Sequence, residues 1–291
     1  MKLATFSQAG STRIGVVRGD ELVDLSAAAP ELPRDMIGFL AAGPRARQRA
    51  GEAAAASGAQ IPLADVLLES PILRPPKFLA IGLNYADHAA EAGLELPKFP
   101  IVFNKQSTCV AGPYAEVHMP RVSSSLDYEA ELAFVIGKRC RHVPRARAHE
   151  VIAGYCVHDD VSVRDWQLRV PTMTMGKSWD THCPFGPWVT TVDEVADPHD
   201  LALQTWVNGE LRQSASTSDL IFNCDQIIEH LSTAFTLEPG DVIVTGTPSG
   251  VGLWMDPKSW LKDGDVVKIE IAGLGVIENR VIDEPEGTAQ Y

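Results

Sequence analysis

Hydrophobic and polar positions alternate with a period of two along much of the chain, and this period predicts β-strands. Near the N-terminus, short strands at 14–17 and 22–25 flank a turn at 18–21 (RGDE). From Lys77 onward, apolar runs are separated by glycine- and proline-containing turns, and FLAIGL at 78–83 predicts a buried strand. We therefore expect an α+β fold that is predominantly β.

The first part of the chain differs in amino-acid composition from the rest. An alanine-rich stretch at 34–58 has good helix propensity but few large apolar side chains, so a helix there is expected to be peripheral. The proline-rich segment from Pro71 to Pro76 is typical of a linker. We expect a small N-terminal α/β domain at residues 1–70 and a main domain at residues 71–291.

The first buried strand leads into NYADHAAEAG (84–93), which predicts a helix of about two turns. Asn84 is expected to cap this helix and Gly93 to end it. His88 and Glu91 are three positions apart, so their side chains lie side by side on one face. A histidine beside a carboxylate is an arrangement suited to general-base catalysis.

A second helix is predicted from residue 223 onward. Asn223 and Gln226 have the spacing of a capping box. The apolar stripe that follows consists of Ile227, Ile228, Leu231 and Phe235. This stripe predicts a scaffold helix that packs on a core.

Acidic side chains mark the strand predicted at SLDYEAELAFVIGK (125–138). Because side chains alternate across a strand, Asp127, Glu129 and Glu131 share one face. Two carboxylates at positions i and i+2 at the rim of a core repel each other unless a cation lies between them. The pattern alone also fits a solvent-exposed strand face, so a metal site and an ordinary acidic surface both stay open.

A second predicted strand, GYCVHDDVSVRDWQ (154–167), offers further metal ligands. His158 and Asp160 lie on one of its faces and Asp159 lies on the other. Three carboxylates favour a hard ion, Mg²⁺ or Mn²⁺, over Zn²⁺. His158 fits a core histidine equally well, and Lys177 in MGKSWD fits a surface lysine, so the residues alone leave these roles open.

Charge and composition narrow the set of partners. The formal net charge of -13 at pH 7 disfavours nucleic acid and anionic membranes, although a bound cation can reverse the field inside one pocket. The five cysteines form no Cys-x-x-Cys pair, so we expect reduced thiols. Neither a signal peptide nor an apolar run of about 18 residues is present, and we expect a cytoplasmic protein without nucleic-acid or membrane partners.

Six segments carry a family resemblance. They are IGLNYADHAAE, DYEAELAFVIGK, GYCVHDDVSVRDWQ, MGKSWDTHCPFGPW, VNGELRQ and EPGDVIVTGTPSGVG. In this order along the chain they resemble the fumarylacetoacetate hydrolase family, from residue 77 to about residue 275. The resemblance implies that family's mixed β-sandwich roll and a homodimer. The first 70 residues resemble the smaller, variable domain of the longer bacterial members.

The resemblance also implies roles for individual residues. The implied residues are Glu129, Glu131 and Asp160 for an Mg²⁺ or Mn²⁺ ion, His88, Glu91 and Lys177 for catalysis, and Arg164, Gln167, Gly246 and Thr247 for substrate contacts. The resemblance thus favours Asp160 over His158 as the third ligand. The glycine-rich TGTPSGVG segment lacks the Gly-Lys-Ser/Thr ending of a phosphate-binding loop.

The implied enzyme hydrolyses a C–C bond of an acylpyruvate, a 2,4-dioxo acid similar to fumarylacetoacetate or fumarylpyruvate, through a metal-bound enolate. We expect His88, made more basic by Glu91, to take a proton from the attacking water. The alternatives in the family are oxaloacetate-type decarboxylation and hydroxymuconate-type isomerisation or lyase chemistry; an inactive binding protein is a further one. The histidine–glutamate pair favours hydrolysis. The stretch LRVPTMTM (168–175) resembles a mobile loop that shapes specificity.

Overall fold

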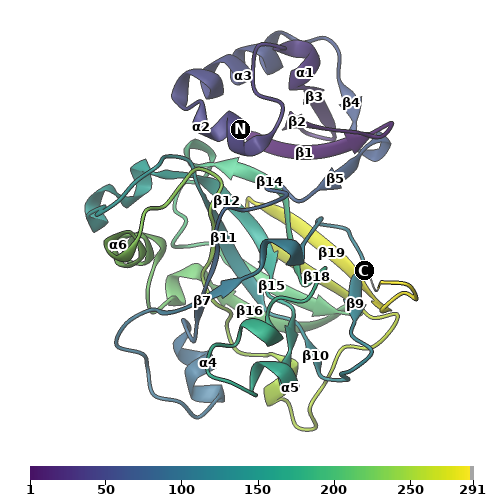
Figure 1. Cartoon of the computed structure of the whole chain (residues 1–291), viewed down its shortest axis with the longest axis vertical. Helices are drawn as coiled ribbons and strands as arrows, with labels where there is room; N and C mark the ends of the chain where they lie inside the picture. The colour runs from purple at the N-terminus through teal and green to yellow at the C-terminus, as the bar shows by residue number, and fades with distance from the viewer. Residues whose placement is uncertain (289–291) are drawn as a thin grey trace.

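Strands form most of the protein (Figure 1), as the alternating pattern predicts. The computed structural model describes residues 1–288, and twelve of their strands belong to one large sheet. The main path of this sheet, in spatial order, is β4 (Ile61–Pro62), β3 (Glu21–Asp24), β2 (Ser11–Arg18), β1 (Lys2–Gln8), β14 (Cys183–Thr191), β12 (Ile152–Asp159), β11 (Ala130–Ile136), β17 (Val242–Val244), β6 (Phe78–Gly82) and β7 (Ile101–Lys105). Beside this path, β5 (Leu67–Glu69) pairs with β1, and β8 (Val110–Ala111) pairs with β14.

A second, five-stranded sheet packs against the large one. Its strands, in spatial order, are β16 (Glu210–Ser216), β15 (Ala202–Val207), β18 (Val266–Ile271), β19 (Gly275–Asp283) and β9 (Val117–Met119). A separate short pair joins β10 (Leu126–Asp127) to β13 (Ser162–Val163). This short pair brings the chain entering β11 next to the chain leaving β12, and the acidic residues lie at that point.

Helices occupy the edges of this β framework. They are α1 (Leu25–Ala28), α2 (Met36–Ala41), α3 (Pro44–Ala56), α4 (Ala86–Glu91), α5 (Arg164–Gln167) and α6 (Cys224–Ala234). The alanine-rich stretch forms α2 and α3, which lie at one end of the molecule beside the N-terminus (Figure 1). Helix α2 is less peripheral than predicted, because Met36, Phe39 and Leu40 are buried in a hydrophobic core. α4 and α5 lie near each other at the opposite end.

Strand β11 is buried on both faces because its side chains alternate between two hydrophobic cores. Leu132 and Phe134 belong to the core shared with the smaller sheet and α6, whereas Ala133 and Val135 belong to the core on the other side. By the same alternation, Glu131 lies on the face of Ala133 and Val135. An acidic residue therefore enters the protein on a fully buried strand, where its charge needs a partner.

Helix α6 has the capping box that the sequence predicts. The Asn223 side chain accepts from the Gln226 backbone at 3.1 Å, and the Gln226 side chain accepts from the Asn223 backbone at 3.1 Å. Ile227 and Leu231 are fully buried in the core beneath it. This helix is scaffold, as expected.

The predicted cap of α4 is wrong. The helix begins after Tyr85, and the Asn84 side chain is directed elsewhere. The Asn84 amide donates to the carbonyl oxygens of Phe222 and Thr245 at 2.9 and 2.7 Å and accepts from the Phe222 backbone at 2.8 Å. A fully buried amide needs all of these partners, and they are more than 100 positions away, so local spacing did not reveal them.

The N-terminal segment continues the large sheet. Lys2 and Leu3 of β1 pair with Thr190 and Val189 of β14. Leu3 and Phe39 lie in the same hydrophobic cluster as β11 and β14 residues. The N-terminal strands and helices therefore pack directly on the main part of the protein, and the division near residue 70 stays a prediction.

Two further features concern the whole chain. The five cysteines are free thiols, as expected. Within residues 1–288, none of the helices has both the length and the apolar character that a bilayer crossing requires.

Candidate metal centre and adjoining cavity

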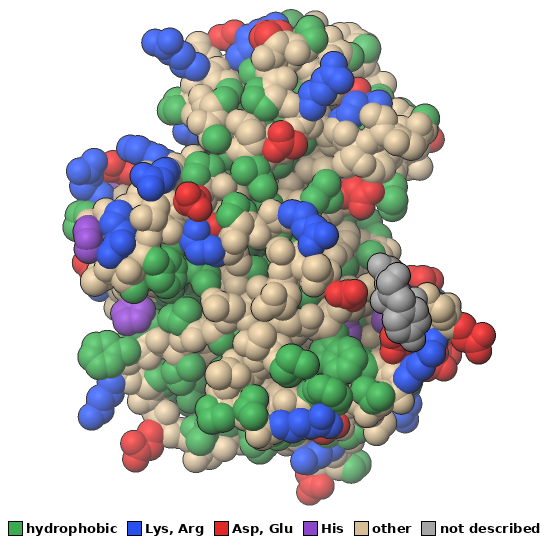
Figure 2. All heavy atoms as spheres, viewed as in Figure 1, with side chains coloured by type: hydrophobic (Ala, Val, Ile, Leu, Met, Phe, Trp, Pro, Cys, Tyr) green, Lys and Arg blue, Asp and Glu red, His purple; other side chains and the backbone are tan. Residues whose placement is uncertain are grey.

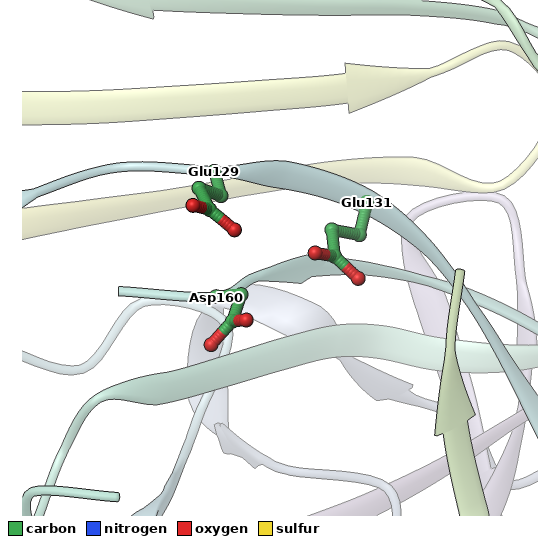
Figure 3. Close-up of side chains that lie close together, drawn as sticks. All are labelled: Glu129, Glu131 and Asp160. Atoms are coloured by element: carbon green, nitrogen blue, oxygen red, sulfur yellow. The ribbon is translucent and has the colours of Figure 1, made fainter. Parts of the chain in front are cut away.

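Three buried carboxylates meet where β11 begins and β12 ends. Glu129 immediately precedes β11, Glu131 is its second residue, and Asp160 immediately follows β12. The Asp160 backbone donates to the Glu129 carbonyl oxygen at 2.9 Å, which fixes the two segments side by side. One ligand atom from each of the three side chains lies within 4.8 Å of the others. Figure 3 shows the three side chains close together.

The charge balance at this cluster favours a cation. Among residues 1–288, no lysine, arginine or histidine forms an ion pair with Glu131, whose Oε2 accepts from the Gly246 backbone at 2.8 Å. Burial, followed by the negative charges of Asp160 and Glu129, raises the pKa of Glu131 well above its usual value. A divalent ion would remove this repulsion, and an all-oxygen donor set suits Mg²⁺ or Mn²⁺. The residues present therefore fit such an ion.

Two buried lysines neutralise part of the cluster. Lys177 Nζ lies 2.7 Å from Glu129 Oε2 and 2.9 Å from Asp160 Oδ2. Lys105 Nζ pairs with Asp160 Oδ1. Burial opposes ionisation of Asp160, but Lys105 and Lys177 hold the pKa of Asp160 below its usual value. The structure thus brings the predicted Lys177 to the carboxylates and adds Lys105, which the sequence analysis missed.

Arg164 links the carboxylates to α5. Its Nε donates to Asp127 Oδ2 at 2.8 Å, and its Nη1 donates to Glu129 Oε1 at 2.5 Å and to Gln167 Oε1 at 2.9 Å. Asp127 also accepts from the backbone of Gly252 at 2.8 Å. Asp127 therefore holds the arginine in place, a role that its position on the acidic strand face did not indicate.

The other acidic and basic residues of the second strand lie outside the carboxylate cluster. His158 is fully buried and packs edge-on against Phe78 with ring centroids 5.5 Å apart. Burial lowers the pKa of His158 to about 3. Asp159 Oδ1 accepts from the Glu129 backbone at 2.9 Å, and burial raises the pKa of Asp159 to about 8. Of the three residues considered from sequence, only Asp160 joins the two glutamates.

The histidine–glutamate pair on α4 is formed. His88 Nδ1 lies 3.0 Å from Glu91 Oε2, and the second oxygen of Glu91 accepts from the Gly250 backbone at 2.9 Å. Asp87 Oδ2 accepts from the Ser249 hydroxyl at 2.6 Å. Two residues of α4 are therefore tied to the glycine-rich loop, which fixes the orientation of the histidine.

A cavity of about 250 Å³ connects these groups. Its lining contains eight of the ten residues that the sequence analysis proposed for the site, namely His88, Glu129, Glu131, Arg164, Gln167, Lys177, Gly246 and Thr247. Asp160 and Glu91 are held just behind this lining through Lys177 and His88. A larger cavity of about 910 Å³ is lined by Trp166, Trp179 and His182 among others. None of the ten proposed residues lines the larger cavity, so the smaller one is the candidate site.

At position 246, in the wall of this cavity, only glycine fits. Its φ is +94°, and a Cβ atom there would lie 2.8 Å from the Ile81 carbonyl oxygen and from the Asn84 Cβ. The neighbouring Thr247 Oγ1 accepts from the Gln213 amide at 2.8 Å. Its hydroxyl hydrogen is therefore available for a ligand.

This combination of sheet topology and buried carboxylates agrees with a known family. Residues 77–282 match the family described as the fumarylacetoacetate hydrolase C-terminal domain, and the chain belongs to this family. Its members include hydrolases, isomerases and tautomerases, and the chain is an enzyme.

Individual relatives carry different names. The chain is 43% identical over 265 residues to a mitochondrial oxaloacetate tautomerase of Rattus norvegicus, covering 91% of this chain and 85% of that protein. It is similar to the maleylpyruvate hydrolase of Sphingobium sp. SYK-6, solved with a manganese(II) ion and pyruvate, with a TM-score of 0.83, 36% identity and coverage of 98% and 100% of the two chains. It is also similar to 5-carboxymethyl-2-hydroxymuconate delta-isomerase of Mycobacterium smegmatis, with a TM-score of 0.78, 35% identity and the same coverage.

Proposed function

We propose that the protein is a hydrolase that uses a divalent metal ion to cleave a C–C bond of an acylpyruvate-type 2,4-dioxo acid. The observation that carries this proposal is the formed His88–Glu91 pair, 3.0 Å apart, beside a cavity that also contains the buried carboxylates. A metal-binding site alone also suits decarboxylation, whereas a general base next to it can activate the water that hydrolysis requires.

Glu129, Glu131 and Asp160 are proposed to hold Mg²⁺ or Mn²⁺. Such an ion would bind the oxygens of a 2-oxo acid and stabilise negative charge on them. The proposal is supported by the separation of the ligand atoms within 4.8 Å and by the manganese and pyruvate in the Sphingobium relative. Thr247 and Arg164, which line the cavity, are proposed to contact the substrate carboxylate.

The dyad acts on water. Because His88 Nδ1 faces Glu91, the other ring nitrogen is left to accept a proton from a water molecule in the cavity. The hydroxyl group bonds to the 4-oxo carbon, and the bond between carbons 3 and 4 breaks. Its electron pair passes to the pyruvate fragment, which leaves as an enolate and takes up a proton, and the acyl fragment leaves as a carboxylic acid.

Negative charge on the attacked oxygen needs hydrogen-bond donors. Lys177, Gln167 and Arg164 line the same cavity and carry the available N–H groups. Removal of one such donor typically costs about 3–4 kcal/mol of transition-state stabilisation. These three side chains are proposed as the stabilising donors.

A second candidate is a proton-transfer reaction such as oxaloacetate tautomerisation. It is favoured by the relative of that name, which matches 91% of this chain. Tautomerisation and the isomerisation named in the Mycobacterium smegmatis relative need a base but no attacking water. Decarboxylation needs neither. Hydrolysis remains the first proposal because it uses both the histidine base and the hydrogen-bond donors that line the cavity.

The homodimer implied by the family resemblance is also proposed for this chain. A molecular mass of twice 31.5 kDa, measured by light scattering, would agree with a homodimer. A molecular mass of 31.5 kDa would contradict it. The cytoplasmic location stays a prediction.

The test compares hydrolysis with metal binding. His88→Gln is expected to bind Mn²⁺ as the unaltered protein does, because it leaves the carboxylates intact, but to lose at least a hundredfold in acylpyruvate hydrolysis. The decrease of acylpyruvate ultraviolet absorbance measures hydrolysis, and titration calorimetry measures Mn²⁺ binding. His230→Gln, on the exposed side of α6, is the control. Unaltered hydrolysis in His88→Gln would refute the proposed base, and oxaloacetate tautomerisation without acylpyruvate cleavage would favour the second candidate.

A further inference from the structure

The candidate cavity changes character between its inner end and its mouth. At the inner end, Glu131, Arg164 and Lys177 are only 1–3% exposed. The exposed lining residues at the mouth are apolar: Leu94 at 57%, Ile101 at 39%, Leu168 at 69% and Trp254 at 43%. Charge is therefore concentrated where a 2-oxo acid head group would bind, and apolar surface lies where the rest of the molecule would extend.

The two cations of the lining, Arg164 and Lys177, lie at the inner end of the cavity. Arg164 is bonded to Asp127 and Glu129, and Lys177 is bonded to Glu129 and Asp160. Apart from these two, the described lining of the cavity contains no lysine or arginine. A second carboxylate at the mouth would thus meet no fixed positive charge.

The basic residue nearest in sequence to the mouth is held elsewhere. The Arg169 guanidinium stacks over Trp166 at 3.8 Å from the ring centroid and pairs with Asp165 at 3.5 Å. Neither Trp166 nor Asp165 belongs to the lining of the cavity. The overall charge of -13 further disfavours the binding of a substrate with an anionic tail.

Four separate segments supply the apolar mouth. Leu94 follows α4, Ile101 begins β7, Leu168 follows α5, and Trp254 follows the glycine-rich loop. In Figure 2, hydrophobic side chains gather on the lower part of the visible face, in the region that α4 and α5 occupy in Figure 1. Apolar side chains therefore border the entrance on more than one side.

From this division we infer that the enzyme selects acylpyruvates whose acyl tail is short, uncharged and apolar, over acylpyruvates whose tail ends in a second carboxylate. The inference rests on the proposed function and names its substrate class. The cavity of about 250 Å³ is smaller than the roughly 300–1,000 Å³ of sites for drug-sized ligands, so the protein can cover only a tail of a few carbons. Each methylene that leaves water strengthens binding by up to about fourfold, whereas an unpaired carboxylate against apolar side chains weakens it.

The first experiment measures binding without catalysis. The probes are 2-oxoheptanoate and 2-oxoheptanedioate, which have the same chain length and lack the 4-oxo group, so neither is hydrolysed. Titration calorimetry on the full-length, Mn²⁺-loaded protein is expected to give at least tenfold tighter binding for the monoacid. Equal binding of the two probes, or tighter binding of the diacid, would overturn the inference.

The second experiment places a cation at the mouth. Leu168→Arg is expected to reduce the preference for the monoacid at least fivefold, because the new guanidinium can pair with the distal carboxylate. Val170→Arg is the matched control: it adds the same charge on the same segment, at a residue that is 47% exposed and absent from the lining. An effect of Val170→Arg as large as that of Leu168→Arg would overturn the assignment to the mouth.

Failure of the proposed function has a different outcome. If the monoacid preference is found but no acylpyruvate is hydrolysed, the reaction is wrong and the selectivity of the cavity stands. If acylpyruvates with both kinds of tail are hydrolysed with equal kcat/KM, the reaction stands and the inferred substrate class is wrong.

Discussion

Lys105 lies at the candidate metal centre, although the sequence did not indicate it as a residue of the site. Its side chain is fully buried and its ammonium group pairs with Asp160, which is 55 positions away. Burial by itself would lower the pKa of Lys105, but the charge of Asp160 raises it above its usual value. The lysine therefore stays charged and supplies part of the positive charge that a metal ion would also supply.

Replacing Lys105 should make the free energy of unfolding depend on whether Mn²⁺ is bound. Lys105→Met is expected to lower the free energy of unfolding of the metal-free protein by about 3 kcal/mol, because removal of one partner of a buried ion pair leaves the other uncompensated. Added Mn²⁺ should restore part of this loss, since the ion stabilises only the folded protein. Urea unfolding with and without Mn²⁺ measures both effects. Lys138→Met, at an exposed position, is the control, and a metal-free Lys105→Met protein as stable as the control would contradict this role.

His182 links stability to pH. It is fully buried, and its Nε2 donates to the His118 carbonyl oxygen at 2.8 Å. Burial lowers the pKa of His182 from 6.5 to about 4. A lowered pKa in the folded state means that the stabilisation is complete above pH 6.5 and is lost as the pH falls through 4.

The size of this effect follows from the shift. The His182 contribution to the free energy of unfolding should fall by about 3 kcal/mol between pH 6.5 and pH 4. In His182→Gln the decline over this interval should be smaller by about that amount, as measured by denaturant unfolding at a series of pH values. His230→Gln should decline as the unaltered protein does. Parallel curves for His182→Gln and the unaltered protein would contradict the prediction.

At the scale of elements, α4 is too short to hold its own position, so its contacts with the glycine-rich loop decide where His88 lies. The loop contributes the Ser249 hydroxyl to Asp87 and the Gly250 backbone to Glu91. Both contacts span about 160 positions of sequence. The helix supplies the local spacing of the dyad, and the loop fixes its orientation.

Loosening this contact should affect catalysis more than metal binding. Ser249→Ala removes the donor to Asp87 and is expected to lower kcat of hydrolysis roughly tenfold, because a catalytic group displaced by a fraction of an ångström loses alignment. The Kd for Mn²⁺ should stay unchanged, since the carboxylate that Ser249 contacts is that of Asp87 and not one of the three proposed ligands. Ser214→Ala, at an exposed position on β16, is the control. An unchanged kcat in Ser249→Ala would show that the loop does not position the dyad.

The elements also show where sequence patterns suffice. The strand at 78–83, the helix with His88 and Glu91, and the capping box of α6 follow from spacings of two to four residues, and all three are found in the structure. The role of Asn84 was wrong because its partners come from distant segments. Lys105 and the anchoring role of Asp127 were missed for the same reason, since sheet pairing, not local pattern, brings them to their partners.

At the scale of the whole molecule, the N-terminal segment and the main part share a sheet and a hydrophobic cluster. β1 adds to the edge of β14, and Leu3 packs in the same cluster as Val135. The first 70 residues differ from the rest in composition, and this difference predicted a separate domain. The pairing of residues nearly 190 positions apart leaves no local pattern in the sequence, so it was not predicted. The long sheet places the N-terminal helices far from α4 and α5 (Figure 1), so the candidate cavity is built from the main part alone.

The central claim is that Glu129, Glu131 and Asp160 bind one divalent ion. The most direct test is a crystal of the Mn²⁺-soaked protein with diffraction recorded at the manganese absorption edge. We expect one anomalous peak with an oxygen of each of the three carboxylates within about 2.0–2.6 Å. The Glu131→Gln crystal is expected to lose this peak. An ion bound elsewhere, or no peak between the three carboxylates, would contradict the account.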